Sequence, residues 1–129
     1  LVSLARDGNE GQTEFAAGAL CNLATNDDNE AVIVAAGGIE VFMSLARDGN
    51  ERQKKRAAGA LWNLSDNDDN SVAIAAAGGV EVLISLARDG AKGQKEEAAG
   101  ALCNMTGAAP ATHEGVVEAG GVAVLSSLT

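Results

Sequence analysis

Residues 57–65 read Ala-Ala-Gly-Ala-Leu-Trp-Asn-Leu-Ser, and this stretch has a near copy on either side of it. The copies are Ala-Ala-Gly-Ala-Leu-Cys-Asn-Leu at 16–23 and Ala-Ala-Gly-Ala-Leu-Cys-Asn-Met at 98–105. The asparagines of the three copies, Asn22, Asn63 and Asn104, follow one another at intervals of 41 residues. A fixed period of this length indicates repeated units that bury their apolar faces against one another. The sequence therefore predicts a stack of similar units.

Each unit is predicted to contain three helices and no strand, because no stretch alternates with a period of two. In the middle copy, Ala57, Ala60, Leu61 and Leu64 fall at i, i+3, i+4 and i+7, which places them on one helix face. The helices that carry the asparagines are expected at about 12–24, 53–65 and 94–106. Short helices are expected at 30–36, 71–77 and 113–119, and amphipathic helices at 39–48, 80–89 and 122–129, with the tail of another at 1–7.

Glycine, aspartate and asparagine mark the ends of these helices. Single glycines after the amphipathic helices are expected to stop them in the left-handed conformation. Glycine pairs between the short and amphipathic helices predict sharp corners, and the Asp and Asn residues of the links at 25–29 and 66–70 are expected to cap the short helices. The single glycines are Gly8, Gly49 and Gly90, and the pairs are Gly37-Gly38, Gly78-Gly79 and Gly120-Gly121.

Composition and charge limit the function classes. The chain has 129 residues, of which 47% are apolar but only 2% aromatic, so that a core of Ala, Leu, Val and Ile is expected. The net charge of −9 disfavours binding to nucleic acid or to anionic membranes and favours a basic partner. Cys21 and Cys103 occupy equivalent positions two repeats apart, roughly 20 Å at helix spacings of 8–10 Å, which excludes a disulfide between them. An intracellular setting, cytoplasmic or nuclear, is therefore expected.

The Ala-Ala-Gly-Ala-Leu-x-Asn-Leu pattern and the Ala-Gly-Gly-Ile/Val corner at 36–39 and 77–80 resemble the armadillo repeat, most closely its β-catenin-like and plant F-box–armadillo branches. The resemblance covers the whole chain. It implies an all-α, right-handed superhelical solenoid and a piece of a longer array, because the chain opens in mid-pattern. Residues 26–66 and 67–107 would be complete repeats, and 1–25 and 108–129 partial ones.

The resemblance also implies that the asparagine-bearing helices line a concave groove in which an extended peptide lies. Asn22, Asn63 and Asn104 would then hydrogen-bond the peptide backbone, for which an amide has both donors and acceptor. Alternatively, each asparagine bonds a carbonyl of the adjacent repeat. Gly59 stands one turn before Asn63, where importin-α-type repeats carry a tryptophan, so a nuclear-import adaptor is a weaker match.

Residues two turns before each asparagine differ between copies, which is where a specific partner would be recognised. A basic pair lies between two copies with acidic residues, which predicts an acidic residue flanked by bases in the partner; alternatively, these residues are a solvated first turn. Trp62 is predicted to anchor the ligand or to fill the space between repeats. The pairs are Glu14-Phe15, Lys55-Arg56 and Glu96-Glu97, and the candidate peptide-binding residues are Asn22, Asn63, Asn104, Gly59, Arg56, Lys55, Trp62, Phe15 and Glu97.

The sequence contains no arrangement of residues typical of catalysis. The residues from Asp66 to Asn70 have the spacing of the first ligands of a calcium loop, but Ser71 stands where that loop needs glycine. No cofactor, metal, nucleic acid or membrane is expected. The predicted function is a non-enzymatic scaffold that binds an extended, partly basic protein segment. The alternatives are an importin-α-like adaptor and a ligand-free spacer, and end-to-end self-association is expected because capping helices are missing.

Overall fold

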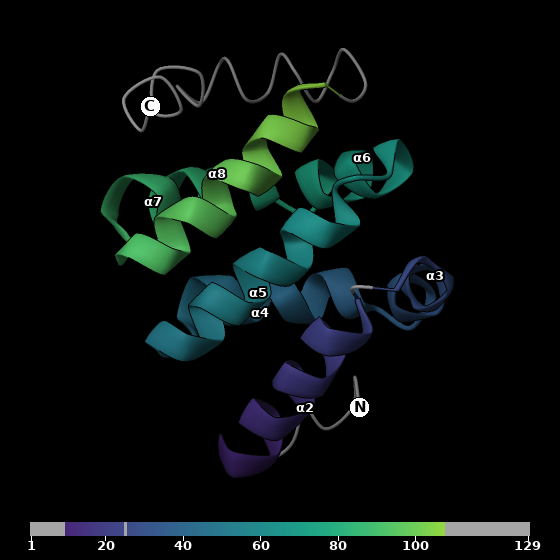
Figure 1. Ribbon diagram of the computed structural model, residues 1–129, viewed down its shortest axis with the longest axis horizontal. Coiled ribbons are helices and arrows are strands. Elements are labelled where there is room, and N and C mark those ends of the chain that lie inside the picture. The colour runs from purple at the N-terminus through teal and green to yellow at the C-terminus, as the bar shows by residue number, and fades with distance from the viewer. Residues whose placement is uncertain (1–9, 25, 108–129) are drawn as a thin grey trace.

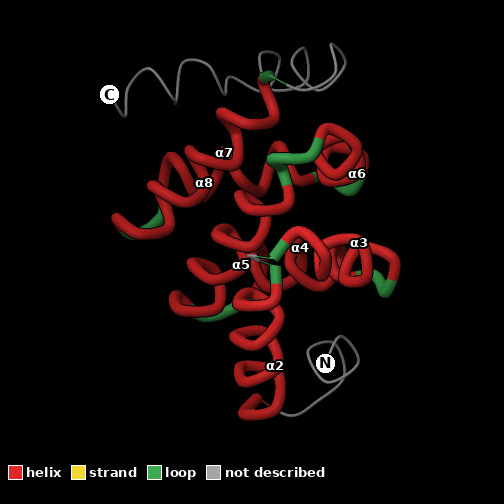
Figure 2. The backbone as a smooth tube through the Cα atoms, turned by 45° about the vertical axis from the view of Figure 1, so that its right-hand side comes forward, coloured by secondary structure: helices red, strands yellow, loops and turns green. Residues whose placement is uncertain are grey.

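The computed structural model describes residues 10–24 and 26–107, which form seven α-helices joined by short links (Figure 1). This part of the chain contains no strand (Figure 2), as the sequence predicts. The helices are α2 (Glu10–Leu23), α3 (Asp27–Ala35), α4 (Gly38–Asp48), α5 (Glu51–Leu64), α6 (Asp68–Ala76), α7 (Gly79–Asp89) and α8 (Lys92–Thr106).

The helices are arranged as repeated triplets. Helices α3, α4 and α5 form one triplet and α6, α7 and α8 the next, while α2 is equivalent to α5 and α8. Helix α5 packs against α2 on one side and α8 on the other, so the three asparagine-bearing helices form a row (Figure 1). Helices α4 and α7 pack against α5 and α8, respectively. The expected stack of similar helix triplets is confirmed.

The core lies between the asparagine-bearing helices and the amphipathic helices. The predicted apolar face of α5 is fully buried, with Ala57, Leu61 and Leu64 at 0% exposure. From the amphipathic helices, Phe42 of α4 and its equivalent Leu83 of α7 are also at 0%. Burial of a large apolar side chain contributes about 1.5–3 kcal/mol. The apolar periodicity of the sequence therefore identifies the core side of the helices.

The glycine pairs form the predicted corners. Helices α3 and α4 meet at 78°, and α6 and α7 at 87°. Gly37 and Gly78 have φ angles of 90° and 86°, in the left-handed region that glycine adopts without strain. The second glycine of each pair begins the amphipathic helix.

The prediction that Gly49 and Gly90 stop their helices in the left-handed conformation is wrong. Both residues follow an amphipathic helix, but their φ angles are −73° and −75°, in the extended region. Glycine is needed there for space, because a Cβ atom at either position would lie 2.5 Å from the carbonyl oxygen of Leu45 or Leu86. The links thus use the small size of glycine rather than its left-handed conformation.

The short helices begin earlier than predicted. Helix α6 begins at Asp68 rather than at residue 71, and α3 begins at Asp27 rather than at residue 30. The side chain of Asn67 accepts a hydrogen bond of 3.1 Å from the backbone N–H of Asn70, which satisfies a donor in the first turn of α6. Capping by the Asn/Asp link is confirmed for α6, and the capping residue, Asn67, is the second residue of the link.

Several predictions lie outside the described residues. They concern the helices expected at 1–7, 113–119 and 122–129, the stop at Gly8, and the corner at Gly120-Gly121. End-to-end self-association likewise stays a prediction. No single helix in the described ranges is long and apolar enough to cross a membrane, and only the bent pairs α3–α4 and α6–α7 reach that length and composition together.

Candidate peptide-binding site

Two open cavities lie along the row of α2, α5 and α8. The larger, of about 700 Å³, lies mainly between α5 and α8 and is called here the α5–α8 cavity. The smaller, of about 470 Å³, lies between α2 and α5 and is called the α2–α5 cavity. Arg52 and Arg56 of α5 line both cavities, so they stand on the boundary between them. The two cavities therefore adjoin each other along the surface of the three helices.

The structure brings most of the predicted binding residues to these cavities. All of the nine candidates except Asn104 line one or both of them. The α5–α8 cavity is lined by Lys55, Arg56, Gly59, Trp62, Asn63 and Glu97, and the α2–α5 cavity by Phe15, Asn22 and Arg56.

The glycines that precede the asparagines are covered by side chains from neighbouring helices. A Cβ atom on Gly18 of α2 would overlap the guanidinium of Arg56, which reaches it from α5. A Cβ atom on Gly59 of α5 would lie 3.1 Å from Oε2 of Glu97, which reaches it from α8. Arg56 and Glu97 occupy equivalent positions in consecutive repeats. Each of these side chains therefore rests on the glycine of the preceding asparagine-bearing helix.

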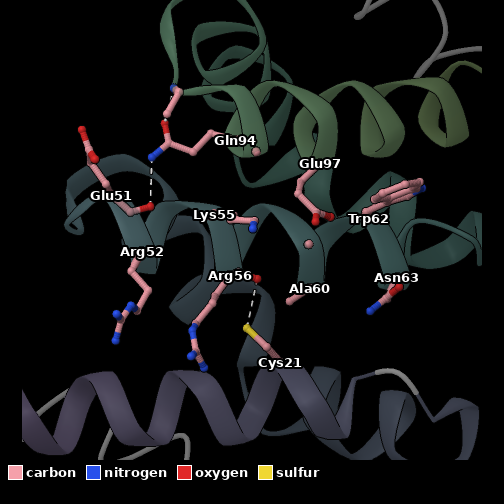
Figure 3. Close-up of a pocket in the computed structure, with 13 residues that line it drawn as sticks. Cys21, Glu51, Arg52, Lys55, Arg56, Ala60, Trp62, Asn63, Gln94 and Glu97 are labelled. Atoms are coloured by element: carbon pink, nitrogen blue, oxygen red, sulfur yellow. Dashed lines mark hydrogen bonds between the residues drawn. The ribbon is translucent and has the colours of Figure 1, made fainter.

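Trp62 makes the reciprocal contact between α5 and α8. A Cβ atom on Gly100 of α8 would overlap the indole ring of Trp62, which reaches forward from α5. The Trp62 residue as a whole is nevertheless 41% exposed. Trp62 therefore fills space between repeats, as one of the two alternatives expects, and still presents part of its surface to the cavity (Figure 3).

Glu97 carries a perturbed carboxyl group. Partial burial raises its pKa above the ordinary value, whereas Lys55 lowers the pKa and Glu96 raises it. The net effect is an increase, so the removal of water from the carboxylate outweighs the attraction of Lys55. The Lys55 side chain lies over Gly93 in the first turn of α8, with Cε 2.8 Å from the position of a Cβ atom there. A cation near Glu97 would stabilise its charged form.

Comparison with known families identifies the repeat to which these helix triplets belong. The model of the Armadillo/beta-catenin-like repeat matches the chain twice, at residues 26–66 and 67–107. The chain belongs to the armadillo repeat family. The predicted all-α, right-handed armadillo solenoid is thus confirmed, and this fold is a non-enzymatic scaffold for protein binding.

Solved structures of engineered proteins share the fold. An engineered protein of the Northeast Structural Genomics Consortium has 35% sequence identity and a TM-score of 0.89, with 98% of this chain and 52% of that chain covered. A designed armadillo repeat protein in complex with the peptide (KR)4 has 26% identity and a TM-score of 0.90, with 98% and 54% covered. This chain therefore spans about half the length of these proteins. No curated protein sequence matches the chain.

The three asparagines of the armadillo array differ in their surroundings. The side-chain amide of Asn104 donates to the carbonyl oxygen of Trp62 and to Oγ of Ser65, both at 3.3 Å. This is the internal alternative, a bond to the adjacent repeat. Asn63 is partly buried and lines the α5–α8 cavity, whereas Asn22 is exposed and lines the α2–α5 cavity. Contact with a peptide stays a prediction for all three.

Sequence analysis did not identify the role of Gln94. Its side-chain N–H donates to the backbone carbonyl oxygen of Glu51 at 2.9 Å, which links α8 to the first turn of α5 beside the larger cavity. Its Oε1 also accepts a hydrogen bond from the backbone N–H of Ala91. The sequence does contain a signal for this role, because glutamine recurs at the equivalent positions of the other copies, Gln12 and Gln53.

The two cysteines of the armadillo array are free, so the exclusion of a disulfide between them is confirmed. The thiol of Cys21 donates a hydrogen bond of 3.0 Å to the carbonyl oxygen of Arg56, across the boundary between α2 and α5. Burial raises the pKa of Cys21 to about 11, although Arg56 lowers it. Cys103 is exposed at the equivalent position of α8.

We expect an alkylating reagent to modify Cys103 much faster than Cys21. The thiolate is the reactive form, and a pKa of about 11 in place of 9.0 makes its population roughly a hundredfold smaller at pH 8. The check is peptide mass spectrometry after short exposure to iodoacetamide at pH 8. In urea the two rates should converge. Equal rates in the folded protein would contradict the partly buried position of Cys21.

Proposed function

We propose that this armadillo array binds an extended segment of another protein along the surface of α2, α5 and α8. The observation that carries the proposal is the placement of eight predicted binding residues on two adjoining cavities of one helix row. The related designed armadillo protein in complex with the peptide (KR)4 supports a peptide as the ligand class.

The charges of the row favour a segment of mixed charge. Lys55 and Arg56 would attract an acidic residue, and Glu97 would attract a basic one. The net charge of −9 favours a segment that is basic elsewhere. The backbone of the segment would bond to Asn22 and Asn63, whose amides line the cavities. We further propose an intracellular, reducing setting, which suits two free thiols.

The test is an array of eight-residue peptides that mix acidic, basic and neutral residues, probed with the whole chain at physiological salt. The best binder is then titrated calorimetrically against the natural sequence and against Asn22→Ala/Asn63→Ala. We expect the double variant to bind about thirtyfold more weakly, since each backbone hydrogen bond contributes about 1 kcal/mol. An array without a binder would contradict the proposal, and so would an unchanged affinity of the double variant.

The same experiment addresses the alternatives. A nuclear-import adaptor would bind the peptide (KR)4 more tightly than any mixed-charge peptide, whereas we expect (KR)4 to bind more weakly because Lys55 and Arg56 repel it. A ligand-free spacer would leave every peptide unbound.

Asn63 and Asn104 should separate binding from stability. We expect Asn104→Ala to lower the free energy of unfolding by about 1 kcal/mol, because it removes the hydrogen bonds to Trp62 and Ser65. Asn63→Ala should change it by less than about 0.5 kcal/mol and should weaken peptide binding. Urea unfolding followed by circular dichroism measures both variants. A larger loss of stability for Asn63→Ala than for Asn104→Ala would show that Asn63, rather than Asn104, has the structural role.

A further inference from the structure

The helix row carries opposite charges at equivalent positions. Arg56 rests on Gly18 of α2, with its Cζ 3.4 Å from the position of a Cβ atom on that glycine. One repeat later, Glu97 rests on Gly59 of α5, with its carboxylate atoms 3.1–3.8 Å from the equivalent position. The same structural offset thus brings a cation to one boundary between repeats and an anion to the next.

The surroundings reinforce this difference between the two boundaries. Arg52 and Arg56 extend from α5 toward α2, as Figure 3 shows, and both line the α2–α5 cavity. At the other boundary, Glu97 extends from α8 toward α5 (Figure 3), and it lines the same cavity as Trp62. Lys55 lies over Gly93, one turn nearer the N-terminus of α8, so it does not cover Gly59.

Each glycine stands one turn before an asparagine on the same helix. Gly18 precedes Asn22, and Gly59 precedes Asn63, and each pair lines one cavity. A peptide whose backbone bonds to an asparagine therefore has side chains within reach of the charge that covers the neighbouring glycine. That charge comes from the following repeat and not from the helix that supplies the asparagine.

We propose that Arg56 and Glu97 determine the order of charges in the bound segment. An acidic side chain is selected at the boundary of α2 and α5 by Arg56, and a basic side chain at the boundary of α5 and α8 by Glu97. The inference rests on the proposed function. It places the acidic residue at the boundary of α2 and α5 and one basic residue at the boundary of α5 and α8, whereas the sequence alone suggests an acidic residue with bases on both sides.

The physical basis is attraction at each boundary combined with repulsion of the reversed order. A guanidinium binds a carboxylate with two parallel hydrogen bonds. A basic ligand group would compensate the partly buried carboxylate of Glu97, and the aromatic ring of the partly exposed Trp62 would attract the same cation. A segment in reversed order would bring like charges together at both boundaries, and such repulsion is a common source of specificity.

The experiment exchanges the two charges in the whole chain. The variant Arg56→Glu/Glu97→Arg keeps the net charge, and so does the control Arg47→Glu/Asp48→Arg, whose exposed residues lie in the last turn of α4. The probes are extended peptides with one Asp and one Lys separated by one, two or three neutral residues, in both orders. Affinities are measured by fluorescence anisotropy at physiological salt.

We expect the natural sequence and the control to prefer the same order of Asp and Lys by about tenfold, and the exchanged variant to prefer the reversed order by a similar factor. Unchanged preference in the exchanged variant, or equal binding of both orders by the natural sequence, would overturn the inference while leaving peptide binding intact. Absence of binding by all three proteins would instead contradict the proposed function.

A second pair of variants covers the case in which the exchanged protein does not fold. Arg56→Gln and Glu97→Gln remove one charge each and keep similar side-chain volumes. We expect each to reduce the tenfold preference to about threefold or less, with a melting temperature close to that of the natural sequence. A full preference in either variant would show that the deleted charge does not select the ligand.

Discussion

Phe42→Ala is expected to lower the free energy of unfolding by about 3–5 kcal/mol, whereas Phe15→Ala should change it by less than about 0.5 kcal/mol. These are the two phenylalanines of the chain. Phe42 of α4 is 0% exposed within the core, so its truncation removes apolar burial and leaves a cavity. Phe15 of α2 is 75% exposed, so its truncation removes little buried surface.

Urea unfolding of the whole chain, followed by circular dichroism at 222 nm, gives both changes. Phe42→Leu serves as a milder variant where the alanine variant is unfolded before urea is added, with an expected loss of about 1–1.5 kcal/mol. Phe15→Ala has a second use, because Phe15 lines the α2–α5 cavity and its loss should weaken peptide binding. Comparable losses of stability for Phe15→Ala and Phe42→Ala would contradict the assignment of the core.

The difference between the two phenylalanines was predictable from the sequence only in part. Phe42 belongs to an apolar stripe with Ile39 and Met43, and all three are buried. Such stripes report burial directly, because every repeat places the same helix face against the same neighbours. The helix triplets and the row of asparagine-bearing helices could be foreseen for that reason.

Contacts between repeats were harder to foresee. The sequence identifies Gly18, Gly59 and Gly100 as equivalent, but not the side chains that cover them, because these reach across from other helices. Arg56 and Glu97 reach backward to the preceding asparagine-bearing helix, while Trp62 reaches forward to the following one. The sequence pattern does not indicate which side chain of a neighbouring helix covers each glycine, because that depends on how the helices are spaced and inclined.

The single glycines show a second limit. Gly49 and Gly90 follow their helices where a left-handed stop is common, yet both are extended. Glycine is compatible with a left-handed conformation and with close packing, so its presence alone does not distinguish them. The distinction required the positions of the carbonyl oxygens of Leu45 and Leu86.

Gly79→Ala is expected to lower the free energy of unfolding by about 2–3 kcal/mol, more than the loss of about 1 kcal/mol expected for Gly78→Ala. Of these two glycines, Gly78 alone has a positive φ angle, 86°, so conformation alone would predict the opposite order. A Cβ atom on Gly79 would lie 2.7 Å from the carbonyl oxygen of Ile74 and would overlap the side chain of Ile74. A Cβ atom on Gly78 would have room, because its nearest neighbour is Oε2 of Glu81 at 3.7 Å.

The repulsion at Gly79 involves backbone, which a side-chain rotation cannot relieve. The corner between α6 and α7 would have to open, and the contact of α7 with α8 would weaken with it. Gly107→Ala is the matched control, because Gly107 has a φ angle of −87° and its nearest neighbour would lie 3.7 Å away. Its expected change is less than about 0.5 kcal/mol. Urea unfolding ranks the three variants, and a greater loss for Gly78→Ala than for Gly79→Ala would show that left-handed geometry, rather than close approach of α6 and α7, governs this corner.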